Sequence, residues 1–592
     1  MENLIASRCN TSNTLNESSV NQIKAWIESC SANHEVCGIG RKLNSSQKNF
    51  PTRLLQIDNM KNISLKTTEG LSPDTKYLTL SHCMYISQSD HASRGTSFVG
   101  FLTTSYSAMN PLNLPAVFSN DPLSVMLTPR FAGWGTNPII RLLKETHSSF
   151  SLSIPWPLLP RTFQHAIDLT QTLGFDYIWI DSLCIIQDSK EDWQKESARM
   201  GDVYSQSHVN IAATASSDGS GGLYHRENSL AINPCLIEVT ESNSQIPRTF
   251  LCYQETFWNE KVENGPLGKR GWVLQERILS PRVVHFASNQ MFWECGEMIA
   301  AEFLPSNFTR WDPDLKNLKT SRPHVGDEAH SERLYEAWGG IVRKYSQCDL
   351  TYESDKLIAI SGLAQRACRQ LGLESKDYLA GLWKAYLPGE LLWQTNRGEG
   401  NRKKVADRAP SWSWASVNGA ITCASPVPNH ARVHARVLEA NVFQLSDSFG
   451  QVSGGQIRLQ APISKVTFRQ VDLLLAASKT PFTADLDGTT GTLHCYSRHV
   501  DWDDETCSES AEKNEGFFLI MHSQSNWYRG FCAGLMIQHT GLNRGQYRRL
   551  GKISGRIQGV DALLKAAIDP SLLEARLYSE ADPEKGFIVE II

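Results

Sequence analysis

The chain has 592 residues and a formal net charge of only −4, so it is too long for one ordinary hydrophobic core. Lys and Arg do not gather densely anywhere, and we therefore expect no nucleic-acid partner. No stretch approaches the roughly 20 apolar residues that a membrane span needs, and the N-terminus lacks the apolar core of a signal peptide. These features predict a cytoplasmic protein without a membrane span, whose 14 cysteines are mostly buried free thiols.

The first 50 residues are polar and predict a partly helical N-terminal segment. Within it, Cys30, His34 and Cys37 have side chains of the kind that bind zinc. Zinc in a structural site normally takes four ligands, and no fourth is evident nearby. We therefore expect no bound metal, with these three residues as weak candidates and a small packed helix end as the alternative.

Two segments, 51–58 and 76–83, have the pattern of strands, and the second ends in the polar residues Ser81 and His82. Residues 84–133 then contain neither Lys nor Glu and are rich in Ser, Thr, Pro and Asn. Loops of this length are uncommon inside compact domains. We interpret 84–133 as an anomalous insertion, either a retained intron or a disordered loop.

The segment 177–180 is an uninterrupted apolar run that predicts a strand buried on both faces, as in a parallel sheet. A helical pattern over 161–173 precedes it and stops at Gly174, a residue typical of helix ends. After it, Ser189 resembles a helix N-cap, and 209–213 alternates as a strand does. Open α/β sheets bind ligands at the carboxyl ends of their strands, which makes Asp181, Cys184 and Gln187 candidate site residues.

The rest of the chain changes character twice. A short helix is expected over 270–280, followed by a hairpin of strands 283–286 and 290–295. Residues 301–431 have mainly helical spacing, whereas 432–592 contain short strands separated by Gly and Asp turns. We therefore expect a domain at 51–300, a helical extension at 301–431 and a β-rich region at 432–592.

Three blocks of the chain together resemble the fungal heterokaryon-incompatibility (HET) domain. They are 77–83 with Trp134-Gly135, 173–187 with Met200 and Tyr204, and 270–282 with 293–295; weaker similarities follow at 355–356, 381–383, 392–393 and 410–414. In the family the first block runs on directly into Trp-Gly, whereas here 84–133 separates the two parts. Joining Cys83 to Trp134 restores the pattern.

The resemblance implies a mostly parallel sheet flanked by helices, distantly similar to the TIR and flavodoxin-like folds. It also implies an effector or regulator of heterokaryon incompatibility, self/non-self recognition and programmed cell death, triggered by a protein partner and able to form a homo-oligomer. Some TIR domains cleave NAD, so an NAD-cleaving hydrolase is one alternative, with NAD as substrate and no certain cofactor. An accessory protein of a secondary-metabolite biosynthetic gene cluster is another.

Cleavage of a glycosidic bond requires a carboxylate that stabilises an oxocarbenium-like transition state. The family blocks offer Asp181, Glu276 and Glu294, and we expect them to be neighbours. Arg270 and Arg277 lie near Glu276 in the sequence and are expected to lower its pKa. A structural ion pair or cap is the alternative role for each carboxylate.

His82 is the fourth catalytic candidate, because it could pair with the thiol of Cys83 or Cys184 while Asp181 orients its ring. Packing is the commoner role of such cysteines. The candidates for binding a nucleotide are Trp134, Cys184, Gln187 and Arg277. Tryptophans at 134, 179, 272 and 293 could stack on a base, although large aromatic residues in apolar segments usually belong to the core.

Overall fold

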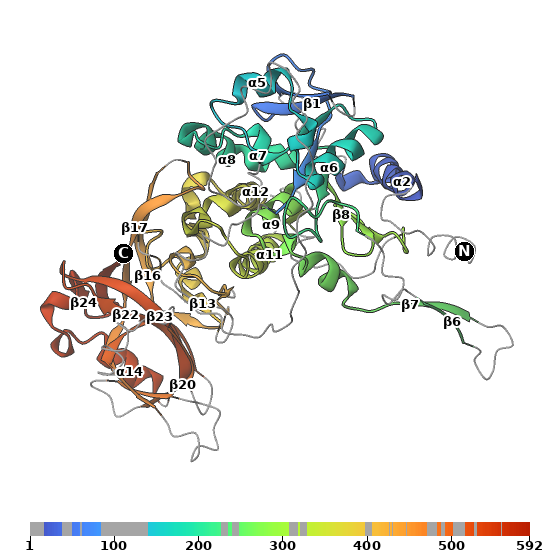
Figure 1. Cartoon of the computed structure of the whole chain (residues 1–592). Coiled ribbons are helices and arrows are strands. Elements are labelled where there is room, and N and C mark those ends of the chain that lie inside the picture. Colours follow the sequence, from blue (N-terminus) through green and yellow to red (C-terminus); the bar gives the residue numbers. More distant parts are fainter. Residues whose placement is uncertain are drawn as a thin grey trace, which may run out of the picture.

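The computed structural model shows an α/β part, a helical part and a C-terminal β part that follow one another along the chain, with the helical part between the other two (Figure 1). The structure describes residues 17–37, 50–59, 62–83, 140–225, 235–239, 248–306, 318–319, 328–396, 405, 407–424, 427–428, 430–445, 447–470, 482–486, 492–500, 515–525, 530–557 and 559–592. The insertion at 84–133 and the adjoining Trp134 lie outside these residues.

An eight-stranded sheet forms the first part, in the order β10-β9-β8-β5-β3-β4-β1-β2. Its strands are β1 (Arg53–Asn59), β2 (Asn62–Thr67), β3 (Leu78–Ser81), β4 (Tyr177–Trp179), β5 (Val209–Ala212), β8 (Arg282–Phe286), β9 (Met291–Cys295) and β10 (Ile299–Ala301). The centre, from β8 to β4, is parallel, whereas both flanks are antiparallel. The expected mostly parallel sheet is thus found only at the centre. The pairs β1–β2, β8–β9 and β9–β10 are joined by short turns and are therefore antiparallel, whereas β1 pairs antiparallel with β4 although the two strands are far apart in sequence.

Helices surround this sheet (Figure 1). They are α2 (Glu17–Asn33), α5 (His147–Leu152), α6 (Arg161–Thr172), α7 (Asp181–Cys184), α8 (Lys190–Ser205) and α9 (Gly271–Leu279). Helix α6 packs against β1 and β4, and α2 packs against β9. The predicted ends of two helices are confirmed. Gly174 has a φ of +85° just after α6, and the Ser189 side chain accepts a hydrogen bond from the Asp192 backbone N–H at the start of α8.

The helical part consists mainly of α11 (Glu328–Ser346) and α12 (Ser361–Leu371), joined by short 3₁₀ turns. Helix α12 packs against both α8 and α9 and so links this part to the sheet. Gly362 of α12 faces Gly201 of α8, and a Cβ built on Gly362 would lie 2.9 Å from the Gly201 Cα. The close crossing of these two helices therefore requires a glycine at both positions.

Small β-structures accompany the helical part and the first sheet. They are the pairs β11 (Tyr378–Leu379) with β12 (Leu382–Trp383), β13 (Gln394–Thr395) with β14 (Ile421–Thr422), and β6 (Cys235–Val239) with β7 (Arg248–Cys252). The pair β6–β7 extends away from the body of the molecule (Figure 1).

The predicted β-rich C-terminal region is confirmed as an 11-stranded, almost entirely antiparallel sheet. Its strands are β15 (Arg432–Val433), β16 (Arg436–Gln444), β17 (Val452–Ala461), β18 (Ile463–Gln470), β19 (Phe482–Leu486), β20 (Thr492–Val500), β21 (Glu515–Ser525), β22 (Gly530–His539), β23 (Gln546–Ile557), β24 (Glu580–Asp582) and β25 (Gly586–Ile591), with helix α14 (Val560–Ala567) beside them. The buried guanidinium of Arg549 stacks on Trp393, 3.4 Å from the ring centroid, and donates to its carbonyl. This contact connects the β-rich region to the helical part.

Candidate functional site

Three segments that are distant in sequence meet at the carboxyl ends of the parallel strands. Ser81 ends β3 and His82 follows it, Asp181 follows β4, and Glu276 lies on α9. The His82 Nε2 atom lies 3.6 Å from Asp181 Oδ1, and the Ser81 hydroxyl donates a hydrogen bond to Glu276 Oε2. The structure therefore brings together His82, Asp181 and Glu276, as the position of ligand sites in open α/β sheets predicts. We call Ser81, His82, Asp181 and Glu276 the strand-end site.

The Glu276 carboxyl group is held within a buried polar network. Besides Ser81, the Tyr204 side chain hydrogen-bonds it from α8. Asn210 of β5 then links the network to the sheet, because its amide donates to the Ser81 hydroxyl at 3.0 Å and accepts from Thr79 at 3.1 Å. Ser81 and Tyr204 thus hold the Glu276 side chain from two elements, β3 and α8, while Asn210 of β5 orients the Ser81 hydroxyl.

Burial raises the pKa of Glu276 to about 7, although the hydrogen bond from Ser81 opposes the shift, and the negative charge of Asp181 raises it further. A carboxyl group with this pKa exists in both protonation states near neutral pH. This is the property that a general acid or base requires.

His82 is also buried, and burial lowers the pKa of its imidazole despite the nearby charge of Asp181. Its ring stacks edge-on against Phe163 at a centroid distance of 4.8 Å, which restricts its orientation. The His82 side chain is only 3% exposed, whereas that of Asp181 is 21% exposed. Asp181 is therefore the carboxylate of the strand-end site that solvent reaches.

The expectation that Arg270 and Arg277 lower the pKa of Glu276 holds only for Arg270, and the net shift of this pKa has the opposite direction. The Arg270 guanidinium donates to the His82 carbonyl and lowers the Glu276 pKa only partly, because burial has the larger effect. Arg277 points to Glu294, with 2.6 Å between Nε and Oε2. Adjacent residues on a helix face different directions, so Glu276 and Arg277 enter different networks.

Glu294 forms a second buried cluster with Arg277, His285 and Lys319. Its carboxylate lies 3.2 Å from His285 Nε2 and 3.6 Å from Lys319 Nζ. Burial alone would raise the pKa of Glu294, but the two cations and the hydrogen bond from His285 hold it well below its usual range. Its described contacts are those of a structural ion-pair network, and none of them is a residue of the strand-end site.

The two cysteines considered as nucleophiles are buried, and burial raises the pKa of each thiol, to about 12 for Cys184. The Cys184 carbonyl accepts a hydrogen bond from Arg53 at 2.7 Å, which fixes α7 against β1. A raised thiol pKa disfavours the thiolate that nucleophilic catalysis needs. Gln187, a nucleotide-binding candidate, is half-buried, and its amide donates to the backbone carbonyls of Asp181 and Ile185.

Of the tryptophans considered for stacking, Trp179 and Trp293 are completely buried. Trp272 is half-buried and its indole N–H lies 3.3 Å from an Asp355 carboxylate oxygen. The remaining candidates, Cys30, His34 and Cys37, come from α2 and the turn after it and lie next to the end of β9.

Two residues of the hydrogen-bond network around the strand-end site, Tyr204 and Asn210, were not predicted from the sequence as site residues. Asn210 is polar within the otherwise apolar strand Val209–Ala212, and a buried polar residue on a strand signals a specific hydrogen-bonding role. Tyr204 lies on the same helical stripe as Met200, so only its hydroxyl group distinguishes it from a core residue.

A comparison with protein-family models matches residues 133–276 to the heterokaryon incompatibility protein (HET) family. The chain carries a HET domain. The match begins where the insertion ends and contains Asp181 and Glu276, the two carboxylates of the strand-end site. No curated protein and no solved structure matches the chain.

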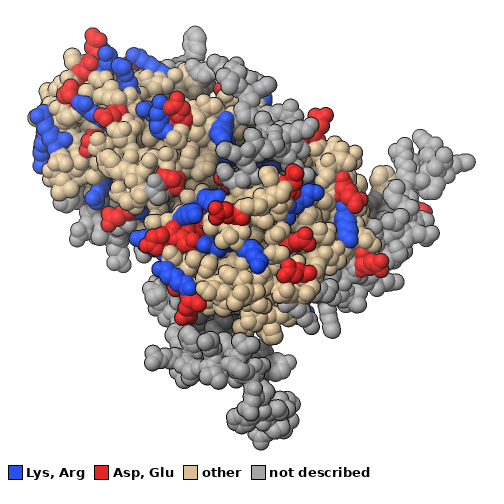
Figure 2. Space-filling view, turned by 90° about the horizontal axis from the view of Figure 1, so that it is seen from above, with Lys and Arg blue, Asp and Glu red and all other residues tan. Residues whose placement is uncertain are grey.

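Two further observations concern the charges on the surface and whether a helix could cross a membrane. On the face shown in Figure 2, basic and acidic side chains are interspersed over the described part of the molecule. Among the described helices, none combines the length and the apolar character required to cross a bilayer.

Proposed function

We propose that this chain is an effector of heterokaryon incompatibility and programmed cell death, and that the strand-end site carries its activity. The match to the HET family is the observation that supports this role. The position of Asp181 and Glu276 at the strand ends, within the matched segment, supports a chemical contribution of the HET domain. A protein partner or a second copy of the chain would act as the trigger.

Hydrolysis of NAD is the second candidate, since the strand-end site holds a solvent-accessible carboxylate next to a carboxyl group whose pKa is about 7. In this reaction the bond between ribose and nicotinamide breaks, and nicotinamide leaves as a neutral molecule. The Asp181 carboxylate would stabilise the oxocarbenium-like ribose, and Glu276 would accept the proton of the attacking water. The products are nicotinamide, ADP-ribose and a proton.

The test is inducible expression in a fungal host of the wild-type chain and of Asp181→Asn and Glu276→Gln, with cell viability as the readout. Glu390→Gln is a matched control, because Glu390 is also buried and burial also raises its pKa, but it lies in the helical part. We expect death with the wild type and the control, and survival with both site variants at equal protein levels.

Other outcomes distinguish the alternatives. Death that persists in both site variants would favour signalling through assembly rather than chemistry. Survival with the wild-type chain would contradict the effector role and favour an accessory role beside biosynthetic enzymes.

Nicotinamide release from NAD by the purified chain, with and without residues 84–133, tests the hydrolase separately. Lack of turnover in both forms would exclude NAD hydrolysis. Sequencing of the transcript shows whether 84–133 is translated.

A further inference from the structure

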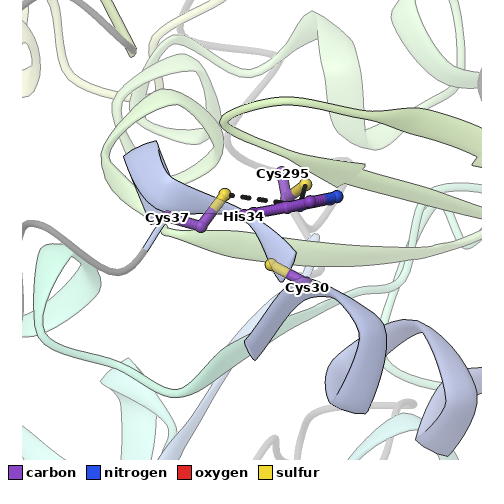
Figure 3. Close-up of side chains that lie close together, drawn as sticks. All are labelled: Cys30, His34, Cys37 and Cys295. Carbon is purple, nitrogen blue, oxygen red and sulfur yellow. Dashed lines mark hydrogen bonds between the residues drawn. The ribbon is translucent and has the colours of Figure 1, made fainter. Parts of the chain in front are cut away.

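Four side chains with soft ligand atoms converge beside the first sheet: Cys30, His34, Cys37 and Cys295 (Figure 3). One atom from each, three sulfurs and one imidazole nitrogen, lies within 4.8 Å of all the others. The first three residues were visible in the sequence as an incomplete set. Cys295 supplies the missing fourth ligand, and it comes from a strand 258 positions after Cys37.

The distances in this cluster fit a tetrahedral metal centre. His34 Nδ1 lies 3.3 Å from Cys295 Sγ and 3.8 Å from Cys37 Sγ. A tetrahedral zinc ion with Zn–S bonds of about 2.3 Å and a Zn–N bond of about 2.0 Å separates its ligand atoms by about 3.5 to 3.8 Å. Three cysteines and one histidine are also a ligand set typical of structural zinc sites.

Local structure explains how the three N-terminal ligands converge. Cys30 lies in the last turn of α2, which ends at Asn33, and His34 and Cys37 follow directly after the helix. The His34 backbone N–H donates to the Cys30 carbonyl at 3.4 Å, which keeps the following segment close to the helix end. Trp26 of the same helix stacks on Trp293 of β9, with ring centroids 5.9 Å apart. This contact positions the end of α2 against the end of β9.

Strand β9 also approaches the four ligand residues closely. Cys295 is the last residue of β9, and Gly296 follows it. A Cβ on Gly296 would lie 3.2 Å from Cys37 Sγ, so a larger residue at this position would require the Cys37 sulfur to shift by a few tenths of an ångström. The backbone therefore approaches the cluster closely at this point.

A buried arginine, Arg282, contacts one of the four ligand residues. The Arg282 side chain is completely buried, and its Nε donates to Cys30 Sγ at 3.2 Å. Its other described contacts are the His208 carbonyl and the Ser31 hydroxyl, both at 3.3 Å. A buried guanidinium requires negative charge nearby, and three thiolates around one Zn²⁺ carry a net charge of −1. The Arg282 contact thus has the form of an outer-sphere hydrogen bond to a metal-bound thiolate.

We propose that Cys30, His34, Cys37 and Cys295 bind one zinc ion, which fastens the N-terminal helix to strand β9. Four protein ligands leave no open coordination position, so the site is structural and takes no part in substrate chemistry. The site does not depend on the proposed function, because it contains no residue of the strand-end site. Through β9 it supports the strand that also carries Glu294.

The test uses the full-length chain purified without chelators from a zinc-replete expression host, with metal content measured by inductively coupled plasma mass spectrometry. We expect about one zinc per wild-type chain and a loss of at least tenfold in occupancy for Cys295→Ser and His34→Ala. Cys368→Ser is the matched control, since Cys368 is buried in α12 away from the cluster, and it should keep its zinc.

A spectroscopic measurement on the wild-type chain keeps the proposal testable if the variants fail to fold. Replacement of zinc by Co²⁺ should produce the strong visible bands of tetrahedral cobalt with thiolate ligands, and removal of the metal by a chelator should lower the melting temperature. Purified wild-type protein without stoichiometric zinc would overturn the proposal. Equal zinc content in the wild type and Cys295→Ser would overturn it as well, as would a disulfide within the cluster under non-reducing mass spectrometry.

Discussion

Replacement of the buried Glu276 by Gln should change how the stability of the chain depends on pH. Burial raises the pKa of Glu276 from the ordinary value of 4.5 to about 7 in the folded protein. The folded state therefore binds a proton more tightly than the unfolded state. The resulting stabilisation is fully present below pH 4.5 and is lost as the pH rises through about 7. Gln resembles the protonated carboxyl group and does not titrate.

The pKa of Glu276 is 4.5 in the unfolded chain and about 7 in the folded chain. At about 1.4 kcal/mol per pH unit, this difference corresponds to about 3 kcal/mol of unfolding free energy. The unfolding free energy of the wild type should fall by this amount relative to Glu276→Gln between about pH 4.5 and 8. Urea unfolding of both proteins, followed by tryptophan fluorescence at several pH values, measures the difference. Parallel pH profiles would refute the reasoning, because they would mean that the Glu276 pKa is not raised by burial.

Two neighbours of Glu276 should shift, in opposite directions, the pH window over which its stabilisation is lost. Asp181 raises the pKa of Glu276 by its charge, so Asp181→Asn should shift the window to lower pH. The Ser81 hydroxyl lowers that pKa by its hydrogen bond, so Ser81→Ala should shift the window upward. Shifts in the same direction for both variants would contradict the assigned contacts.

Substitutions at three further positions test the surrounding structure, and their effect on the unfolding free energy is measured by the same urea unfolding. Glu294→Gln should lower the unfolding free energy by about 3 kcal/mol at pH 7, because it removes the carboxylate beside the buried Lys319 ammonium and one of the two carboxylates beside Arg277, which keeps Glu263 at 3.5 Å. Since the pKa of Glu294 is depressed, this loss should shrink as the pH falls below 4.5, and a constant loss would contradict the ion pair. Gly362→Ala should lower the unfolding free energy by about 1 to 3 kcal/mol, because its Cβ would lie 2.9 Å from the Gly201 Cα. An unchanged unfolding free energy would show that helices α8 and α12 can move apart freely. Ser189→Ala should cost about 1 kcal/mol through the lost cap to the Asp192 N–H, and Ser189→Asp should restore it.

Features that depend on neighbouring residues could be predicted from the sequence. The helix that ends at Gly174, the capped start of α8 and the hairpin of β8 and β9 all occur where the local pattern placed them. The β-rich character of the C-terminal region was equally predictable. Periodicity, capping and turn preference act over a few residues, so one short window contains the information that they need.

The strand-end site was predictable only in outline. The apolar run 177–180 placed Asp181 at the end of a buried strand, and β4 ends there. The sequence did not show that Glu276 turns toward Ser81 while the adjacent Arg277 turns toward Glu294. The partner that a helical side chain contacts is decided only when the neighbouring elements take their places in the fold. The pKa of Glu276 was predicted in the wrong direction because burial, which outweighs a nearby cation, is a property of the assembled fold.

The sequence by itself determined the local succession of elements and the HET signature, and it offered Cys30, His34 and Cys37 only as weak candidates for a metal site that it did not predict. Only the tertiary structure decided that the centre of the sheet is parallel and its flanks antiparallel, that Glu294 belongs to a separate ion-pair network, and that Cys295 completes the set of ligands. The physical reason is the same in each case. Contacts between separate elements, which are 17 residues apart for Arg277 and Glu294 and 258 for Cys37 and Cys295, depend on how the elements are arranged around the sheet, and no local pattern along the chain encodes that arrangement.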